Sequence, residues 1–256
     1  MVAVTRVVLI IEYDGRRYHG SQFQVGLATI QEEIEQAIRG LTGESCRIAA
    51  ASRTDAGVHA CGQVVSFRTN SVLPEQTFVK GLNYYLPRDI AVKAAYRVAG
   101  SFDVRRDAVS REYSYYILNS LTRSPIWMGF AHLVGGYLDI EVINEACQAL
   151  LGEHDFTSFA SITGVNKKCT VRYVYRAVME KRGELAVFNM VANSFLPHQV
   201  RNTIGLLIKV GLGRVSPGEF RSIIEARVPG LAGPMAPACG LRLIRVNYPV
   251  SFGGET

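Results

Sequence analysis

The order of the apolar segments is the feature that most limits the possible folds of this chain. Residues 5–13 form a near-continuous apolar run, which is typical of a strand buried on both faces. Thr29 and Glu32 form a capping-box pattern, and apolar residues with helical spacing follow them. These residues are Ile30, Ile34, Ala37, Ile38 and Leu41. The other expected elements are strands near 45–52, 62–69 and 90–98 and a helix opening near Pro74, which completes the order β-α-β-β-α-β.

The second half of the chain predicts the same order of elements without repeating the sequence. Apolar residues alternate over 113–117, which indicates a strand, and a helical pattern from Ile143 ends at Gly152. The elements that follow are strands near 170–180 and 184–193, helices opening near Val200 and Pro217, and a strand at 241–248. We therefore expect an α+β protein made of two split βαβ units, residues 1–104 and 105–256. A basic cleft is expected where the two sheets meet.

Length and composition exclude several classes of protein. The 256 residues are 48% hydrophobic and 20% charged, which argues against a disordered chain or a coiled coil. The longest apolar runs are far shorter than the roughly 18 residues that a membrane span requires. The N-terminal residues carry no signal-peptide pattern. The sequence thus predicts a soluble cytoplasmic protein with no membrane contact.

The charge balance points to an anionic partner. The net charge is +6, the pI is about 9.1, and most of the 28 basic side chains are arginine. The guanidinium fork suits phosphates and stacked bases, so nucleic acid is a reasonable partner. Genomic base composition or heat tolerance produces the same arginine bias, and charge alone does not separate these causes.

The five cysteines give no sign of a metal site or a disulfide framework. They are widely spaced, odd in number and contain no C-x-x-C pair. The five are Cys46, Cys61, Cys147, Cys169 and Cys239. We expect neither a bound metal nor a disulfide.

The densest polar cluster is the stretch 51–60, which lies between two apolar strands. Arg53 and Asp55 are two residues apart, so an extended segment would place both side chains on one face. An arginine beside a carboxylate keeps the carboxylate ionised, which suits a nucleophile better than a general acid. The alternative is a structural turn in which Thr54 and Asp55 bond the backbone and Gly57 takes a positive φ.

Motifs along most of the chain support the first interpretation. The stretch 52–60, S-R-T-D-A-G-V-H-A, resembles the signature loop of the tRNA pseudouridine synthase A family. Other segments resemble motifs of that family in the same order. They are Y-D-G and H-G-S-Q within 13–22, S-R-E-Y-S-Y at 110–115, F-L-P-H-Q-V-R-N at 195–202 and A-P-A-C-G-L at 236–241. Ser21 departs from the pattern, since tryptophan is usual there.

The resemblance implies a fold, a reaction and roles for single residues. It implies two ferredoxin-like halves around a central antiparallel sheet, and isomerisation of uridine to pseudouridine in the tRNA anticodon stem-loop, at positions numbered 38 to 40. It also implies a homodimer and no cofactor. Asp55 is then the nucleophile, Tyr113 stacks on the target base and Arg201 pairs with Asp55. Arg53 helps to hold the base out of the stem.

The chemistry explains why such residues are needed. The N1–C1′ bond breaks, the uracil turns, C5 bonds to C1′ and the C5 proton leaves. One carboxylate serves by adding to C6, by capturing C1′ or by removing a proton from C2′, and the sequence does not choose among these routes. Flipping a paired base out of a stem costs a few kcal/mol and needs a stacking ring and a phosphate clamp. Basic residues that suit the clamp are Arg105, Arg106 and Arg111.

Other functions and simpler roles remain to be weighed. A zinc deaminase needs H-x-E and P-C-x-x-C, and the chain has neither around His59. A non-catalytic tRNA-binding or RNA-chaperone protein is the stronger alternative, although a phosphate binder gains nothing from Asp55. Tyr113 also fits the role of an ordinary core residue, and Arg201 fits that of a surface residue on a helix. The tyrosines expected to pack rather than stack on bases are Tyr84, Tyr85, Tyr173 and Tyr175.

Overall fold

The computed structural model describes residues 5–160, 170–250 and 252, and these divide into two compact units. One unit runs up to Val109 and takes in the chain from Arg242 onwards, and the other is Ser110–Leu241. Of the residues named above, Cys169 lies outside the described part. The expected domains 1–104 and 105–256 stay a prediction, because compactness alone does not show which stretches fold independently.

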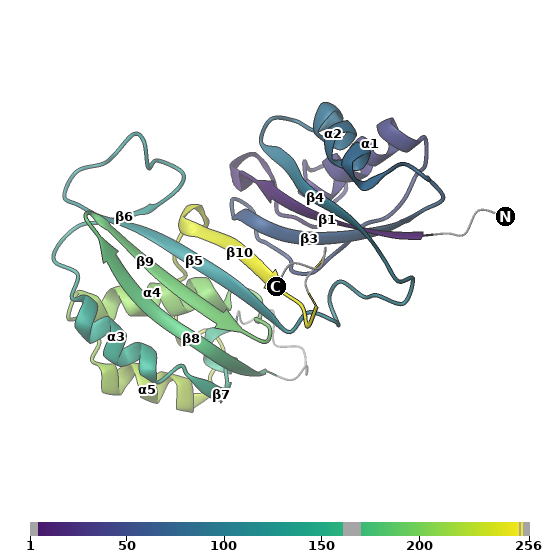
Figure 1. The fold of residues 1–256 in the computed structure, drawn as a ribbon. Helices are drawn as coiled ribbons and strands as arrows, with labels where there is room; N and C mark the ends of the chain where they lie inside the picture. The colour runs from purple at the N-terminus through teal and green to yellow at the C-terminus, as the bar shows by residue number, and fades with distance from the viewer. Residues whose placement is uncertain (1–4, 161–169, 251, 253–256) are drawn as a thin grey trace. The chain divides into compact units, whose positions relative to one another are not determined.

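The first unit holds a sheet in the order β4-β1-β3-β10, with β2 also paired to β3 (Figure 1). Its elements are β1 (Thr5–Tyr13), η1 (Gly15–Arg17), α1 (Ile30–Thr42), β2 (Ala49–Ala50), β3 (His59–Thr69), α2 (Glu75–Tyr85), β4 (Ile90–Val98) and β10 (Leu241–Asn247). β1 is antiparallel to β3 and β4, whereas β10 runs parallel to β3 through Arg242 opposite His59. This parallel pairing lies at the start of β3, directly after the polar loop 51–58.

The core of the first unit lies between its sheet and its two helices. Val7, Val8 and Leu9 are consecutive and fully buried, as expected of a strand covered on both faces. Thr29 begins α1 by accepting a hydrogen bond from the Glu32 amide at 3.3 Å. The apolar residues named above for this helix are all buried except Leu41, so the local pattern predicted α1 correctly.

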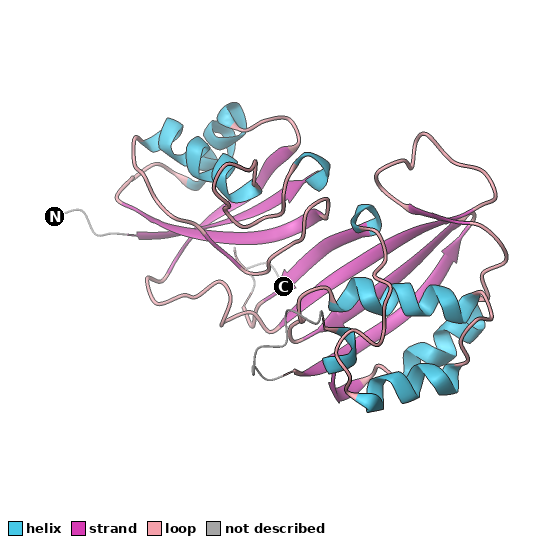
Figure 2. Cartoon of the chain, turned by 180° about the vertical axis from the view of Figure 1, so that it is seen from behind, coloured by secondary structure: helices cyan, strands magenta, loops and turns pink. Residues whose placement is uncertain are grey.

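The second unit holds a sheet in the order β5-β9-β8-β7, with β6 parallel to β5. Its elements are β5 (Ser110–Asn119), β6 (His132–Val134), α3 (Ile140–Gln148), β7 (Gly152–Asp155), η2 (Thr157–Phe159), β8 (Val171–Arg182), β9 (Leu185–Ala192), α4 (Gln199–Gly211), α5 (Pro217–Ala226) and η4 (Ala238–Gly240). Figure 2 shows the helices of this unit over one face of its strands. The side-chain amide of Asn144 joins α3 to β8. It accepts from the Met179 amide at 2.8 Å and donates to the Met179 carbonyl at 2.9 Å.

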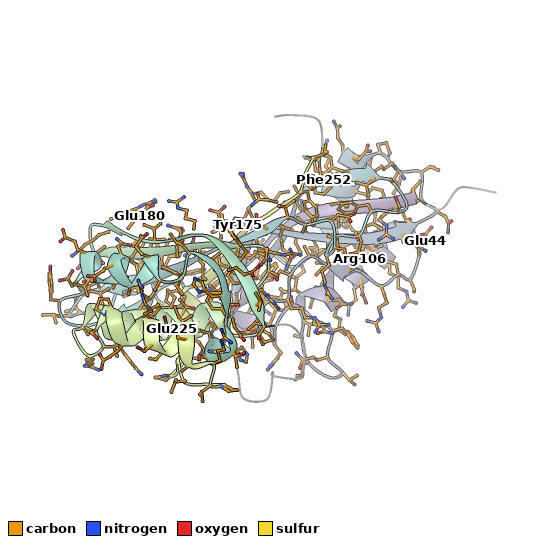
Figure 3. The ribbon with its side chains drawn as sticks, turned by 90° about the horizontal axis from the view of Figure 1, so that it is seen from below. Glu44, Arg106, Tyr175, Glu180, Glu225 and Phe252 are labelled. Carbon is orange, nitrogen blue, oxygen red and sulfur yellow. The ribbon has the colours of Figure 1, made fainter. Side chains whose placement is uncertain are left out.

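The class expected from the sequence is confirmed, with two corrections of detail. The fold is α+β, and neighbouring strands are mostly antiparallel. The strand expected near 45–52 is only two residues long, because the Ile48 amide donates to the Glu35 side chain instead of a neighbouring strand. The four tyrosines expected to pack are at the surface, where they pair with each other. Tyr84 and Tyr85 are 84% and 49% exposed, and Tyr173 and Tyr175 (Figure 3) are 43% and 51% exposed.

Candidate active site

The loop 51–58 is fixed at its start by β3. The Ala51 amide donates to the Val64 carbonyl at 2.8 Å. Gln63, which is 1% exposed, accepts from the Ser52 amide at 3.3 Å and donates to the Ser52 carbonyl at 2.7 Å. A buried side-chain amide thus replaces a neighbouring strand as the partner of Ser52. The loop leaves β2 in a defined direction before it reaches Arg53, which is exposed.

Thr54 is held by the segment 13–21 through all three of its polar groups. Its amide donates to Ser21 Oγ at 2.9 Å and its carbonyl accepts from the Ser21 amide at 3.0 Å. Its hydroxyl lies 2.8 Å from the Tyr13 hydroxyl. Both Thr54 and Ser21 are buried, so water does not compete for these bonds. The residue before Asp55 is therefore among the most constrained of the loop.

Asp55 opens a tight turn that leads into β3. Its carbonyl accepts from the Val58 amide at 3.1 Å, and Gly57 takes a φ of 77°, which favours glycine. The positive φ expected for Gly57 in a structural turn is therefore present, whereas the Thr54 hydroxyl contacts the Tyr13 hydroxyl. The Asp55 side chain is half-buried.

The turn after β1 packs directly against the end of the loop. A Cβ on Gly15 would overlap the Val58 carbonyl, so the two backbones meet without an intervening side chain. Nδ1 of the buried His59 lies 3.3 Å from the Gly15 amide and 3.2 Å from Asp14 Oδ1. Burial opposes ionisation of Asp14, but hydrogen bonds from Arg16 and the charge of His59 outweigh it and lower the pKa of Asp14. An ionised Asp14 thus helps to hold the turn in place.

The environment of Tyr13 predicts alkaline sensitivity. Burial raises the pKa of Tyr13 to about 12, against the opposing effect of hydrogen bonds to Thr54 and Gln63. Because the pKa of Tyr13 is higher in the folded than in the unfolded state, the contribution of neutral Tyr13 to the free energy of unfolding is complete below pH 10. It is lost as the pH rises towards 12. We expect the free energy of unfolding to fall over this range by an amount on the order of 2 kcal/mol from Tyr13 alone.

Denaturant titrations of the wild type and of Tyr13→Phe between pH 8 and pH 12 measure this effect. The fall should be smaller in Tyr13→Phe, whereas Tyr84→Phe, which changes an exposed ring, should follow the wild type. An equal fall in the free energy of unfolding of the wild type and Tyr13→Phe over this pH range would contradict the expectation.

Three residues singled out from the sequence lie in the second unit. Arg111 on β5 is 6% exposed and donates to the Asn193 carbonyl at 2.8 Å. Tyr113 is 5% exposed, and its ring meets that of Phe195 edge-on with 5.2 Å between centroids. Arg201 is half-buried in the first turn of α4, where Nε donates to the Ala236 carbonyl at 2.9 Å. The connection from β9 to α4 therefore contacts Arg111 and Tyr113, whereas Arg201 donates to Ala236.

Of the arginines singled out from the sequence, Arg53 lies in the loop 51–58 and Arg105 contacts the residue just before it. Arg105 is exposed, and its Nη2 donates to the carbonyl of Ala50, the residue immediately before the loop, at 3.5 Å. Arg106 (Figure 3) is exposed and pairs with Asp103 at 3.1 Å. Arg53, Asp55 and Arg105 thus belong to one unit, and Arg111, Tyr113 and Arg201 to the other.

Sequence reasoning missed the residues that support the loop. Tyr13 and Ser21 stood in motifs that carried the family resemblance, but nothing indicated that both bind Thr54. Gln63 gave no signal, because a polar residue in a strand is usually expected at the surface. In the structure its side chain bonds the Ser52 backbone, shortly after β2 ends.

Metal and membrane features can be described for residues 5–160, 170–250 and 252. Over this part of the chain, no three His, Cys, Asp or Glu side chains lie close enough to hold a metal ion. Cys46, Cys61, Cys147 and Cys239 are free thiols, and Cys169 lies outside the described residues. No helix among those described has the length and apolar character needed to cross a membrane.

Comparison with known proteins gives a consistent assignment. A family model described as tRNA pseudouridine synthase matches residues 9–106 and 146–249. Proteins named tRNA pseudouridine synthase A are 42% identical in Acetivibrio thermocellus, over 94% of this chain and 99% of that protein, and 39% identical in Francisella tularensis, over 94% and 93%. The protein of that name from Legionella pneumophila is 38% identical over 97% and 94%. A solved H/ACA RNP bound to a substrate RNA aligns with a TM-score of only 0.37 at 13% identity, which carries no weight here. With most of its length matched by the family model and by these relatives, the chain belongs to the tRNA pseudouridine synthase family, a family of isomerases.

Proposed function

We propose that this protein isomerises uridine to pseudouridine in the anticodon stem-loop of tRNA, at one or more of positions 38 to 40, with Asp55 as the nucleophile and without a cofactor. The single observation that carries the proposal is the way the loop around Asp55 is built. Gln63 binds Ser52, Ser21 binds Thr54 and Gly15 packs against Val58. The Asp55 side chain stays half-buried. Such fixed presentation of one carboxylate suits a reaction in which it attacks a bound base.

The reaction is balanced within the substrate. The N1–C1′ bond breaks, the C5–C1′ bond forms, N1 gains a proton and C5 loses one, so no electrons or groups come from outside. Asp55 supports this by adding to C6, by capturing C1′ or by taking a proton from C2′. Each route uses a carboxylate at a fixed distance from one nucleoside, and each would be disabled by the loss of that carboxylate.

The other residues then take roles that the resemblance implies. Tyr113 is the ring that stacks on the target base, and Arg201 is the cation that pairs with Asp55. Arg53, Arg105 and Arg111 are proposed to bind the RNA and keep the flipped base out of the stem. The exposure of Arg53 and Arg105 supports a phosphate contact most directly, whereas Arg111 is buried and already donates to the Asn193 carbonyl.

The finer description of the fold also belongs to the proposal. The order β4-β1-β3-β2 with helices after β1 and β3 supports a ferredoxin-like first half, and we propose the same for the second half. We also propose a basic cleft, a homodimer, the domains 1–104 and 105–256 and a cytoplasmic location. The resemblance, the order of the elements and the composition support them.

Pseudouridine mapping tests the proposed function. Unmodified tRNA is incubated with the purified protein alone, and pseudouridine is mapped along the whole molecule. We expect pseudouridine at position 38, 39 or 40. Pseudouridine only outside the anticodon stem-loop would overturn the proposed positions. Tight binding with no pseudouridine anywhere would favour the alternative of a non-catalytic tRNA-binding or RNA-chaperone protein.

A further inference from the structure

The Ser21 hydroxyl occupies a position where a hydrogen-bond acceptor is needed. The Thr54 amide points into the protein, Thr54 is 8% exposed, and Ser21 Oγ at 2.9 Å is its acceptor. Ser21 is itself 6% exposed, so removing the hydroxyl would leave a buried N–H without a partner. The serine side chain has one rotatable bond before its oxygen, which makes this contact well defined.

The backbone of Ser21 completes a two-point contact with the same residue. Its amide donates to the Thr54 carbonyl at 3.0 Å, so the segment after η1 pairs with Thr54 through one backbone and one side-chain bond. Gly20 makes this approach possible, because its φ is 99° and a Cβ there would lie 2.9 Å from the Thr54 carbonyl oxygen. The two bonds together fix the peptide planes on both sides of the Thr54 Cα.

We infer that Ser21 is a positioning residue for the reaction, which orients the Asp55 carboxylate by fixing the backbone of Thr54. The inference rests on the proposed role of Asp55 as the nucleophile. The peptide from Thr54 to Asp55 sets the direction of the Asp55 Cα–Cβ bond, so rotation at Thr54 moves the carboxylate. A shift of about 1 Å in a reacting group costs about 10²-fold in rate.

The contact depends on the hydroxyl of Ser21. Tryptophan, which is usual at this position in the family, carries only an N–H donor and has no oxygen to accept from the Thr54 amide. The serine here therefore forms a bond that the usual residue would not form. Its partner Thr54 lies next to the reacting residue, which separates Ser21 from an ordinary buried serine.

Steady-state kinetics on the full-length protein test the inference. We expect Ser21→Ala to lower kcat by about 10- to 100-fold, with the KM for tRNA changed by less than about 2-fold. Ser21→Thr keeps the hydroxyl and should recover most of the lost kcat. If Ser21→Ala does not melt cooperatively, Ser21→Cys, whose sulfur is a weak acceptor, is measured in its place and should lower kcat in the same way.

Ser158→Ala is the matched control. Ser158 is fully buried in the second unit, and its Oγ accepts from the Val228 amide at 3.1 Å, so this variant loses a bond of the same kind in the unit that does not contain the loop. It should lower the melting temperature and leave kcat within about 3-fold of the wild type. Three outcomes would each overturn the inference. They are equal kcat losses in Ser21→Ala and Ser158→Ala, a kcat near the wild-type value in Ser21→Ala, and a change in Ser21→Ala confined to KM.

The Asp55→Asn variant separates this inference from the proposed function. An inactive Asp55→Asn together with a fully active Ser21→Ala overturns the role of Ser21 alone. An active Asp55→Asn overturns the proposed nucleophile and the role of Ser21 with it.

Discussion

Replacing Asp55 by asparagine is expected to lower turnover by about 10³-fold or more and to change tRNA affinity by no more than a few fold. The reason is that the carboxylate carries out bond chemistry, whereas phosphate contacts dominate RNA affinity. The asparagine amide is similar in size to the carboxylate, so the fold of the loop should persist. Single-turnover pseudouridine formation and filter binding to the same tRNA measure the two quantities.

Asp139→Asn provides the control for loss of one carboxylate. Asp139 caps α3 by accepting from the Glu141 and Val142 amides at 3.0 and 3.1 Å, and asparagine caps a helix equally well. This variant should keep wild-type turnover. Turnover above about 1% of the wild type in Asp55→Asn would show that Asp55 is not the nucleophile.

Adding one methyl group at Gly15 is expected to damage both the fold and the activity. The new Cβ would overlap the Val58 carbonyl, so the turn 14–17 or the backbone before His59 must shift. Neither is the end of a flexible side chain, so the cost in stability should be about 1–3 kcal/mol or somewhat more. Because Val58 closes the turn that begins at Asp55, turnover should also fall by about 10²-fold.

Gly100→Ala is the matched control, since no atom lies within 4 Å of a Cβ at that position. Thermal melting and turnover should both remain close to the wild type for Gly100→Ala. A Gly15→Ala protein with a wild-type melting temperature and wild-type turnover would show that the contact between the turn and the loop is dispensable.

The parts of the fold that were predicted from sequence are those with local signals. The helix α1 follows from the Thr29 cap and its apolar spacing, both contained within thirteen residues. The pairing of β10 with β3 had no such signal, because it joins Arg242 to His59 from distant parts of the chain. The shortness of β2 likewise depends on Glu35, a helix side chain that captures the Ile48 amide.

In the candidate site, too, local signals could be read from the sequence and contacts between distant residues could not. Asp55 could be proposed as a site residue from the sequence because polar residues between two apolar strands are unusual and the stretch 52–60 carries a motif. The supports of the loop could not, because Ser21 and Thr54 are far apart in sequence and meet only through the backbone conformation of Gly20. Such contacts join residues that only the folded chain brings together.

The fate of the hydrogen at C5 of uridine tests the central claim most directly. This hydrogen must leave when C5 bonds to C1′, whereas a deaminase leaves C5 untouched and an RNA-binding protein breaks no bond. A uridine C5-methyltransferase would also release it, but only with a methyl donor. The experiment therefore uses tRNA with tritium at uridine C5, the purified protein, and no added cofactor.

We expect tritium to appear in water with the tRNA intact and no free uracil, and we expect no release from Asp55→Asn. Free uracil would indicate a glycosidase. Binding without release of tritium from any tRNA tested would contradict the assignment of Asp55 as the nucleophile of a pseudouridine synthase.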